Sequence, residues 1–443
     1  MSRLSSLIER CARTQAHEPV GVVQNVVGMV VEVGGLRAAV GQTLEVRTEH
    51  GDLELEVVGF RSDRLLASPL GSLSGLQAGT PARLSDRGAS IAVGPQLLGR
   101  VFDAFGNPLD GGPRPEVGQR YAIHRGPPPS FGRKPVADVF ATGVRAMDSM
   151  LTLGVGQRLG IFAGAGVGKS TLLGMICRSS QADVNVVGLI GERGREVSDF
   201  VRHSLGVEGM ARSVVLAATS DQPPLVRAHG AEAATAVAEY FRDQGKSVLL
   251  VMDSVTRYAM ALRETALSAG EPPATKGYPP SVFAALPRLM ERAGTSTGAG
   301  VITALYTVFV EGDDLTDPIA DAARGILDGH VVLSRSLAEK GHFPAIDVLQ
   351  SISRLMPDVT EPTHQSTAGL IREALGTYRD ASDLIQVGAY VPGSDPRVDN
   401  SLTLVPKIHA FLRQGLTEKT PFGQARARMQ ALLSNLPRGA EVH

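Results

Sequence analysis

One ten-residue stretch has the composition of a loop that binds phosphate. Residues 162–171 read FAGAGVGKST, between an apolar run, QRLGIFA, and a run with helical spacing, STLLGMICRSS. Because glycine has no Cβ, the backbone N–H groups around Gly164, Gly166 and Gly168 can converge on phosphate oxygens. The dipole and unpaired N–H groups at the start of the following helix add to this attraction. The stretch therefore predicts a strand, a phosphate loop and a helix.

Two side chains at the end of this loop have the chemistry to act on a nucleotide. Lys169 would reach the β- and γ-phosphates, and the Ser170 hydroxyl would ligate Mg²⁺. The strict motif has glycine where this chain has Ala163, and we expect a methyl group to fit there because the position ends a strand. The residues expected to bind ATP and its Mg²⁺ here are Ala163, Gly164, Ala165, Gly166, Val167, Gly168, Lys169, Ser170 and Thr171.

Two carboxylates follow other apolar runs that are typical of strands. Asp253 ends SVLLVMD, where it would hold Mg²⁺ directly or through water; without a phosphate loop, capping a helix would be the commoner role. Glu192 follows VNVVGLIG, beyond the carboxyl end of the strand, where ligands bind in open α/β sheets. A carboxylate there can polarise a water molecule in line with the γ-phosphate. Taken alone, Glu192 could equally form a surface ion pair with Arg193 or Arg195.

The overall composition is that of a soluble protein with more than one domain. A chain of 443 residues is too long for one hydrophobic core, so two to four domains are expected. The formal net charge of −1 gives no general attraction to nucleic acid or anionic membrane. Without a long apolar run or a signal-peptide pattern, the chain is predicted to be cytoplasmic, with peripheral membrane contact left open. Cys11 and Cys177 lie in apolar helical patterns and are expected in cores.

The pattern of the sequence changes twice along the chain. From 20 to about 90, Val- and Leu-rich runs separated by Gly, Asp and Ser predict a small antiparallel barrel or sandwich. From about 140 to 355, short apolar runs alternate with helical patterns, which is typical of an α/β domain with helices on both faces of a parallel sheet. After 360 only helical periodicity remains, and the Pro- and Gly-rich stretch 124–135 is interpreted as a linker.

Residues 1–15 have the spacing of a short amphipathic helix. Leu4, Leu7, Ile8 and Cys11 form one stripe. Such a helix either packs on its own domain or docks on a partner or a membrane surface. We favour docking, because no strand pattern links the segment to the barrel that starts near residue 20.

Beyond these elements, the chain resembles the type III protein-export ATPases, flagellar branch, which are relatives of the catalytic subunit of rotary ATP synthases. The resemblance covers about residues 20–415. It rests on six motifs in the family's order: GQRLGIFAGAGVGKSTLLGMI, VVGLIGERGREV, VLLVMDSVTRYAMALRE, GEPPATKGYPPSVFAALPRLMERAG, VEGDDLTDPIADAARGILDGHVVLSR and GHFPAIDVLQSISRLMP. Other stretches, such as LIQVGAYVPGSDP, favour the flagellar branch over the virulence injectisomes, although the phosphate loop is shared with the latter.

The resemblance implies an α/β fold with a RecA-like nucleotide-binding core, an N-terminal β-barrel and a C-terminal helical domain. We divide the chain into a docking helix (1–19), the barrel (20–95), a linker plus the ATPase domain (96–359) and the helical domain (360–443). The activity implied is Mg²⁺-dependent ATP hydrolysis, by a homohexameric ring with ATP at subunit interfaces.

The family's functional residues map onto positions of this chain. Lys169 and Ser170 match the phosphate-loop lysine and the Mg²⁺ ligand, and Asp253 matches the second carboxylate at the metal. Glu192 matches the catalytic carboxylate, and Arg193 matches the arginine beside it.

Two further residues are assigned only by the resemblance. Arg354, in SISRLM, matches the arginine that reaches the γ-phosphate of the neighbouring subunit; from the pattern alone it would be a structural arginine after a strand. Phe343, in GHFPAID, matches the aromatic residue that stacks on adenine.

The resemblance also implies partners. A coiled-coil stalk protein would enter the ring's axis, which the loop at 271–280 would line, and a peripheral stator-like regulator would bind the N-terminal helix. Export chaperone–substrate complexes would dock on the C-terminal side, next to a membrane export gate, so that the ring lies peripherally at the inner membrane.

Three other functions fit the sequence less well. A hexameric RNA translocase needs a basic groove with aromatic residues, whereas residues 21–90 contain six Arg, no Lys, eight Asp or Glu, and Phe60 as the single aromatic; no nucleic-acid partner is therefore expected. A non-catalytic nucleotide-holding subunit would lack the carboxylate at Glu192. A rotary ATP synthase catalytic subunit is the closest enzymatic alternative, and the flagellar-type motifs count against it.

Overall fold

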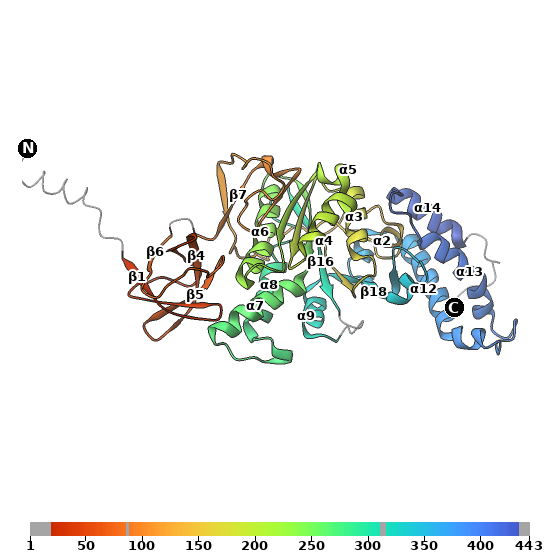
Figure 1. Cartoon of the computed structure of the whole chain (residues 1–443). Helices are drawn as coiled ribbons and strands as arrows, with labels where there is room; N and C mark the ends of the chain where they lie inside the picture. Colours follow the sequence, from red (N-terminus) through yellow and green to blue (C-terminus); the bar gives the residue numbers. More distant parts are fainter. Residues whose placement is uncertain (1–18, 86–87, 311–315, 434–443) are drawn as a thin grey trace, which may run out of the picture.

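The chain folds into three parts that follow one another along an elongated molecule. A small barrel, a central sheet between helices and a group of C-terminal helices succeed each other in the computed structural model, which describes residues 19–85, 88–310 and 316–433 (Figure 1). This confirms the α/β fold class with its N-terminal barrel and C-terminal helices. The helix predicted at 1–15 lies outside the described residues. In the part of the chain that is described, no helix has both the length and the apolar character to cross a bilayer.

Six antiparallel strands close the barrel in the order β1-β2-β5-β4-β3-β6, so of the two predicted alternatives the barrel is present. They are β1 (Val20–Val27), β2 (Val30–Gly34), β3 (Thr43–Thr48), β4 (Gly51–Arg61), β5 (Arg64–Pro69) and β6 (Pro81–Leu84). Side chains of successive strand residues point to opposite faces, so Leu44 and Val46 fill the interior while Glu45 and Arg47 face outward.

Eight strands form the central sheet, in the order β18-β17-β12-β16-β15-β13-β14-β8. They are β8 (Arg100–Phe102), β12 (Arg158–Ala163), β13 (Val184–Ile190), β14 (Ser213–Ala218), β15 (Ser247–Asp253), β16 (Val301–Phe309), β17 (Gly329–Leu333) and β18 (Ile346–Ser353). All neighbours run parallel except β17 and β18, which are antiparallel. The five apolar runs predicted as parallel strands are β12 to β16, and β8, β17 and β18 extend the sheet beyond them.

Helices cover both faces of this sheet. They are α2 (Arg145–Met150), α3 (Lys169–Ser179), α4 (Gly194–Asp199), the π-helix η2 (Phe200–Leu205), α5 (Gly206–Met210), α6 (Pro224–Asp243), α7 (Val255–Ala269), α8 (Pro280–Met290), α9 (Pro318–Ile326) and α10 (Arg335–Glu339). Val186 and Ile190 of β13 belong to the core under α6 and α7, whereas Val187 and Leu189 belong to the core under α2 and α3. Cys177 is fully buried and free, as expected, and burial raises the pKa of its thiol to about 12.

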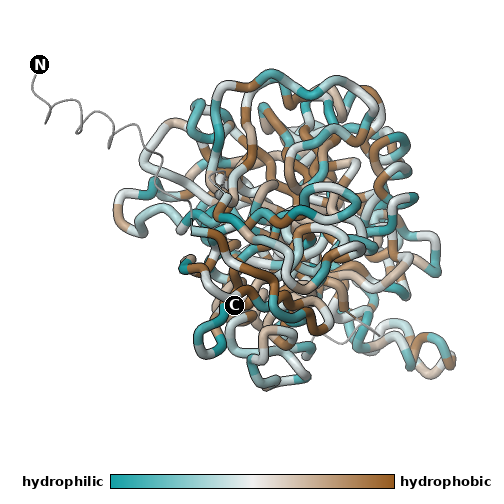
Figure 2. Tube along the Cα trace, turned by 60° about the vertical axis from the view of Figure 1, so that its left-hand side comes forward, coloured by the Kyte–Doolittle hydropathy of each residue, from teal (hydrophilic) through white to brown (hydrophobic). Residues whose placement is uncertain are grey.

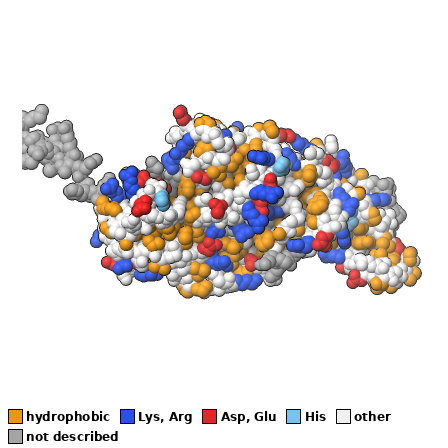
Figure 3. All heavy atoms as spheres, viewed as in Figure 1, with side chains coloured by type: hydrophobic (Ala, Val, Ile, Leu, Met, Phe, Trp, Pro, Cys, Tyr) orange, Lys and Arg blue, Asp and Glu red, His pale blue; other side chains and the backbone are white. Residues whose placement is uncertain are grey.

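Several short elements lie in the connecting segments. They are β7 (Ser90–Val93), η1 (Pro95–Leu97), β9 (Gln119–Ala122), β10 (Val139–Phe140), β11 (Leu153–Gly154), η3 (Thr275–Gly277) and α11 (Met356–Val359). Figure 2 shows apolar stretches running through the interior of the molecule, while polar stretches occupy many of the outer loops. On the face shown in Figure 3, basic and acidic side chains are interspersed.

A buried arginine fastens the C-terminal helices to the nucleotide-binding part. Those helices are α12 (Pro362–Gln386), α13 (Pro396–Leu412) and α14 (Phe422–Leu433). Arg145 of α2 donates hydrogen bonds to the carbonyl oxygens of Phe411 and Arg413 and pairs with the Glu418 carboxylate. Its backbone N–H donates to Gln414 Oε1 at 2.7 Å. The segment after α13 is thereby held against the domain that carries the phosphate loop.

Candidate functional site

The loop from β12 to α3 has the backbone that its glycines predict. Ala163 is the last residue of β12 and is buried between Phe309 of β16 and Leu333 of β17, so a methyl group does fit at this strand end. Gly166 and Gly168 have φ angles of +77° and +91°, which side chains of L-residues rarely tolerate. Helix α3 starts at Lys169 directly after this turn. The loop N–H groups and the helix N-terminus thus meet at one place, as a phosphate site requires.

Three charged side chains converge beside this loop. The Lys169 ammonium lies 2.5 Å from Asp253 Oδ1 and 3.6 Å from Glu192 Oε1. Asp253 is 3% exposed, and its Oδ1 also accepts a hydrogen bond of 2.7 Å from the Thr307 hydroxyl. The structure therefore brings together the lysine and both carboxylates that were selected from separate motifs.

The order of the strands explains this convergence. Lys169 follows β12, Thr307 lies near the end of β16, Asp253 ends β15 and Glu192 comes two residues after β13. These four strands are adjacent and parallel, so their carboxyl ends share one edge of the sheet. Ligands bind at that edge in open α/β sheets.

Glu192 has an environment suited to a base near neutral pH. Burial, contact with Glu196 and the charge of Asp253 raise the pKa of Glu192 to about 7, while Lys169 acts in the opposite direction. The preceding Gly191 has φ +68°, and a Cβ on it would lie 2.9 Å from the Cβ of Arg257. The tight turn that presents Glu192 therefore depends on glycine.

Arg193 is placed differently from its neighbour. Its side chain is 82% exposed, and its guanidinium lies 3.5 Å from the Glu196 carboxylate. The backbone of Arg193 is the N-cap of α4. In this conformation it is a surface residue at the margin of the site, and its catalytic role stays a prediction.

Phe343 lies beside the phosphate loop. A Cβ built on Gly168 would be 3.5 Å from Phe343 Cε1, and the ring is 42% exposed. The Phe343 carbonyl accepts a hydrogen bond of 2.9 Å from the backbone of Gln414, in the segment that Arg145 holds. A partly exposed aromatic ring next to the phosphates is where a nucleotide base can stack.

Arg354 lies at the opposite edge of the sheet. Strand β18 runs antiparallel to β17, with Ser353 opposite Gly329 at the start of β17. The Arg354 N–H donates to the carbonyl of Asp328, whose carboxylate binds Arg158 at the start of β12. The whole length of β12 separates Arg354 from the loop that follows Ala163. Its exposed guanidinium donates to the Arg324 carbonyl at 3.3 Å, and it cannot reach the phosphate loop of its own chain.

The donor set at the carboxyl edge fits Mg²⁺ bound with a nucleotide. Asp253 supplies a carboxylate, and Ser170 supplies an exposed hydroxyl in the first turn of α3. Mg²⁺ prefers a few such oxygen ligands together with phosphate oxygens and water.

Sequence reasoning missed three residues of the site. Thr307 orients Asp253, Glu196 contacts Glu192, and Gln414 binds the backbone at Phe343. Glu196 lies within the quoted motif VVGLIGERGREV, so its spacing from Glu192 was available in the sequence. Thr307 sits inside an apolar strand run, and Gln414 lies in another domain, so neither had a local signal.

Comparison with known proteins identifies the family of this chain. The sequence model of the ATP synthase alpha/beta family, nucleotide-binding domain, matches residues 143–353, and that of the T3SS EscN ATPase C-terminal domain matches residues 360–431. The Flagellum-specific ATP synthase of Bacillus subtilis is 46% identical, covering 98% of this chain and 99% of the relative. Its namesake in Pseudomonas aeruginosa is 51% identical, covering 94% and 93%. The Type 3 secretion system ATPase of Xanthomonas euvesicatoria is 49% identical, covering 89% of each.

A solved structure shares the whole architecture. The assembled ATPase EscN from the enteropathogenic E. coli type III secretion system has a TM-score of 0.88 and 41% identity, over 94% of this chain and 100% of that one. The phosphate loop, the paired carboxylates and the similarity along nearly the full length lead to one conclusion. The chain belongs to the ATP synthase alpha/beta family and, within it, to the group of ATPases that contains the flagellum-specific and type III secretion enzymes.

Proposed function

We propose that this ATPase hydrolyses ATP as a homohexameric ring and thereby energises the type III export of flagellar proteins, by releasing substrates from chaperones and unfolding them at the export gate. The observation that carries the hydrolysis is the convergence of Lys169, Glu192 and Asp253 at one edge of the sheet. The flagellar assignment is supported by relatives named as flagellum-specific that cover more than nine-tenths of the chain.

In the proposed mechanism, the residues of one chain bind ATP and activate water. Loop N–H groups and the Lys169 ammonium hold the β- and γ-phosphates, and Phe343 stacks on adenine. The Glu192 carboxylate accepts a proton from the water whose oxygen attacks the γ-phosphorus, as the bond to the ADP oxygen breaks. Mg²⁺, held by Ser170 and Asp253, would neutralise phosphate charge when bound.

The ring is supported by the position of Arg354. Because Arg354 cannot reach the phosphate loop of its own chain, its proposed action on the transition state would take place in the site of a neighbouring copy. The solved relative with a TM-score of 0.85 is described as assembled ATPase EscN in complex with its central stalk EscO, which supports a stalk protein as a partner here.

The remaining partners are proposed to dock on the two ends of the chain. We assign the docking of a peripheral stator-like regulator to residues 1–19, and the docking of export chaperone–substrate complexes to the helical domain at 360–443. Both would place the ring peripherally at the inner membrane export apparatus, next to the export gate.

Function in the cell is tested by complementing a deletion strain. The wild-type gene should restore swimming, and Glu192→Gln should not, at equal protein levels. A virulence injectisome is the second candidate, because the Xanthomonas euvesicatoria secretion ATPase is nearly as similar. It would be supported instead if the deletion left motility intact and abolished secretion of effector proteins.

The ring is tested separately, with purified protein. If each site is completed by a neighbouring chain, specific ATPase activity should rise steeply with protein concentration through the assembly range. Constant specific activity on dilution through that range would contradict a shared site.

A further inference from the structure

A carboxylate and two imidazoles lie together where the barrel meets the nucleotide-binding domain. Glu56 comes from β4, His124 follows β9, and His229 lies on α6. One ligand atom of each residue lies within 4.8 Å of those of the other two. The cluster shares no residue with the nucleotide site. Its members are far apart in the sequence, so no short metal-binding motif predicts it.

The two buried members lie in close contact at ion-pair distance. His229 is 3% exposed, and its Nε2 lies 2.8 Å from Glu56 Oε2. The Glu56 carboxylate is the partner of His229 Nε2, and this contact lacks the alignment of a well-formed hydrogen bond. A cation held between the two buried atoms would coordinate both of them.

A second carboxylate lies against the third member. His124 Nε2 lies 3.4 Å from Glu56 Oε2, while its Nδ1 lies 2.6 Å from Glu232 Oε2. The other oxygen of Glu232 accepts a hydrogen bond of 3.2 Å from the Tyr258 hydroxyl. A carboxylate behind a histidine that turns its second nitrogen toward a common point is the usual support of a metal-binding imidazole.

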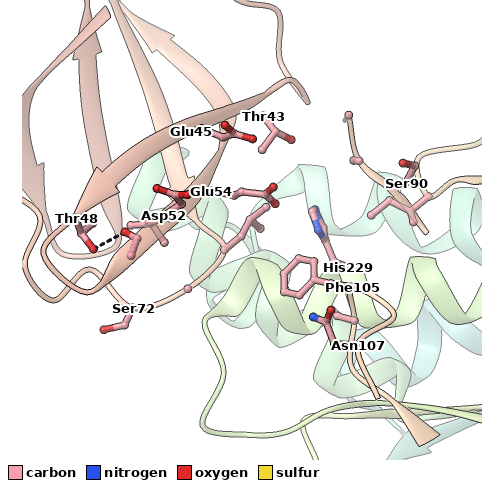
Figure 4. Close-up of a pocket in the computed structure, with 18 of the residues that line it drawn as sticks. Thr43, Glu45, Thr48, Asp52, Glu54, Ser72, Ser90, Phe105, Asn107 and His229 are labelled. Carbon is pink, nitrogen blue, oxygen red and sulfur yellow. Dashed lines mark hydrogen bonds between the residues drawn. The ribbon is translucent and has the colours of Figure 1, made fainter. Parts of the chain in front are cut away.

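Residues of the cluster line two pockets. Glu56, His124 and Glu232 line a pocket of about 340 Å³. His229 lines a second pocket of about 850 Å³, where it lies beside Phe105 and faces barrel carboxylates such as Glu54 (Figure 4). An ion could enter by either pocket, and a water molecule in the smaller one could complete its coordination.

We propose that Glu56, His124 and His229 bind one Zn²⁺ ion, which clamps the barrel to the nucleotide-binding domain. Two imidazole nitrogens and one carboxylate oxygen are a donor set that suits Zn²⁺, with water in the fourth position. Mg²⁺ and Ca²⁺ take oxygen ligands and fit it poorly. The nearby guanidinium of Arg292 is paired with Glu239 and therefore does not neutralise the carboxylates of Glu56 and Glu232.

The test is a calorimetric titration of the full chain with ZnCl₂, after removal of metals by a chelator and with excess Mg²⁺ present. Wild type should bind one Zn²⁺ that His124→Ala does not bind. Glu232→Gln keeps size and shape and removes only the second carboxylate, so it should weaken Zn²⁺ binding about 10–100-fold. His203→Ala, at an exposed histidine of η2, is the matched control and should bind as wild type does.

Thermal unfolding gives a second measurement, because an ion that binds only the folded state raises its melting temperature. Added Zn²⁺ should raise the melting temperature of wild type and of His203→Ala, and should not raise that of His124→Ala. The proposal is overturned if wild type binds no Zn²⁺, or if His124→Ala and Glu232→Gln bind it with wild-type affinity.

Discussion

The two edges of the central sheet carry functional residues of opposite character. At the carboxyl edge, Lys169, Glu192 and Asp253 are largely enclosed, and the lysine pairs with both carboxylates. At the other edge, Arg354 is exposed and has one backbone acceptor for its guanidinium. The six residues of β12 separate the edges by about 20 Å, at ~3.3 Å per residue. In the proposed function, one chain therefore carries two unlike halves of a site, which two neighbouring copies would join.

Removing Arg354, the exposed half of the proposed site, should have the largest effect on kcat. Arg354→Ala should lower kcat by about 10³–10⁵, because an arginine that neutralises transition-state charge is worth that much in related chemistry. ATP binding should change little, since the carboxyl edge is intact. Steady-state ATPase assays on assembled protein measure this, with Arg379→Ala, an exposed arginine of α12, as control.

Mixing two inactive variants tests whether residues from the two edges act together across an interface. Rings assembled from Arg354→Ala and Glu192→Gln chains should recover part of the activity, because some interfaces then pair an intact Glu192 with an intact Arg354. Absence of recovery in rings shown to be mixed would mean that both residues act within one chain.

Removing Glu192, the proposed base at the enclosed edge, should have the next largest effect on kcat. Glu192→Gln should lower kcat by about 10²–10⁴, the usual contribution of a positioned acid or base. The amide has nearly the size of the carboxylate, so ATP affinity should stay close to wild type. Lys169→Ala is the contrasting variant and should weaken ATP binding itself, as a binding titration can show. Activity of Glu192→Gln within tenfold of wild type would remove this residue from the mechanism.

The enclosed edge should also show the stronger dependence on pH. The pKa of Glu192 is raised to about 7, so the carboxylate becomes protonated, and is lost as a base, when the pH falls through that value. The kcat/KM for ATP should therefore fall about tenfold per pH unit below about 7, since this parameter reports ionisations of the free enzyme. Glu196→Gln removes one cause of the raised pKa and should move the midpoint to lower pH. A midpoint unchanged in that variant would contradict the role of Glu196.

The smallest effect is expected at Phe343, at the margin of the enclosed edge. Phe343→Ala should weaken ATP binding by about 1–3 kcal/mol, the range measured for stacking of a base on an aromatic side chain. The kcat of saturated enzyme should change much less. Fluorescent-nucleotide titration checks this, with Phe131→Ala as control because that ring is 95% exposed in the linker. Equal affinity in both variants would mean that adenine does not stack on Phe343.

Features encoded in short windows were predictable from the sequence. The stretch 162–171 and its flanking runs predict a strand, a turn and a helix, because the glycine positions and the apolar spacing that indicate them fall within about ten residues. The apolar runs that became β12 to β16 were found in the same way. Strands β8 and β17 were not predicted, since three to five residues give too little periodicity.

Some contacts of the site could not be predicted from short stretches of sequence. The hydroxyl of Thr307 looked like part of a buried strand, and only the neighbouring position of β15 shows that it binds Asp253. Gln414 reaches Phe343 across two domains. The cluster of Glu56, His124 and His229 depends on how the barrel sits against α6, which no pattern in the chain reports.

Residue types and short patterns are enough to select candidates for binding phosphate, holding a metal ion and activating water, because these abilities depend on side-chain chemistry and on local backbone. Which of these candidates meet depends on the tertiary structure. Strand order places the ends of β12, β15 and β13 at one edge, and the reversed direction of β18 carries Arg354 to the other. Those pairings are made between segments dozens of residues apart, through backbone hydrogen bonds that every residue type except proline can donate, so side-chain patterns do not specify them.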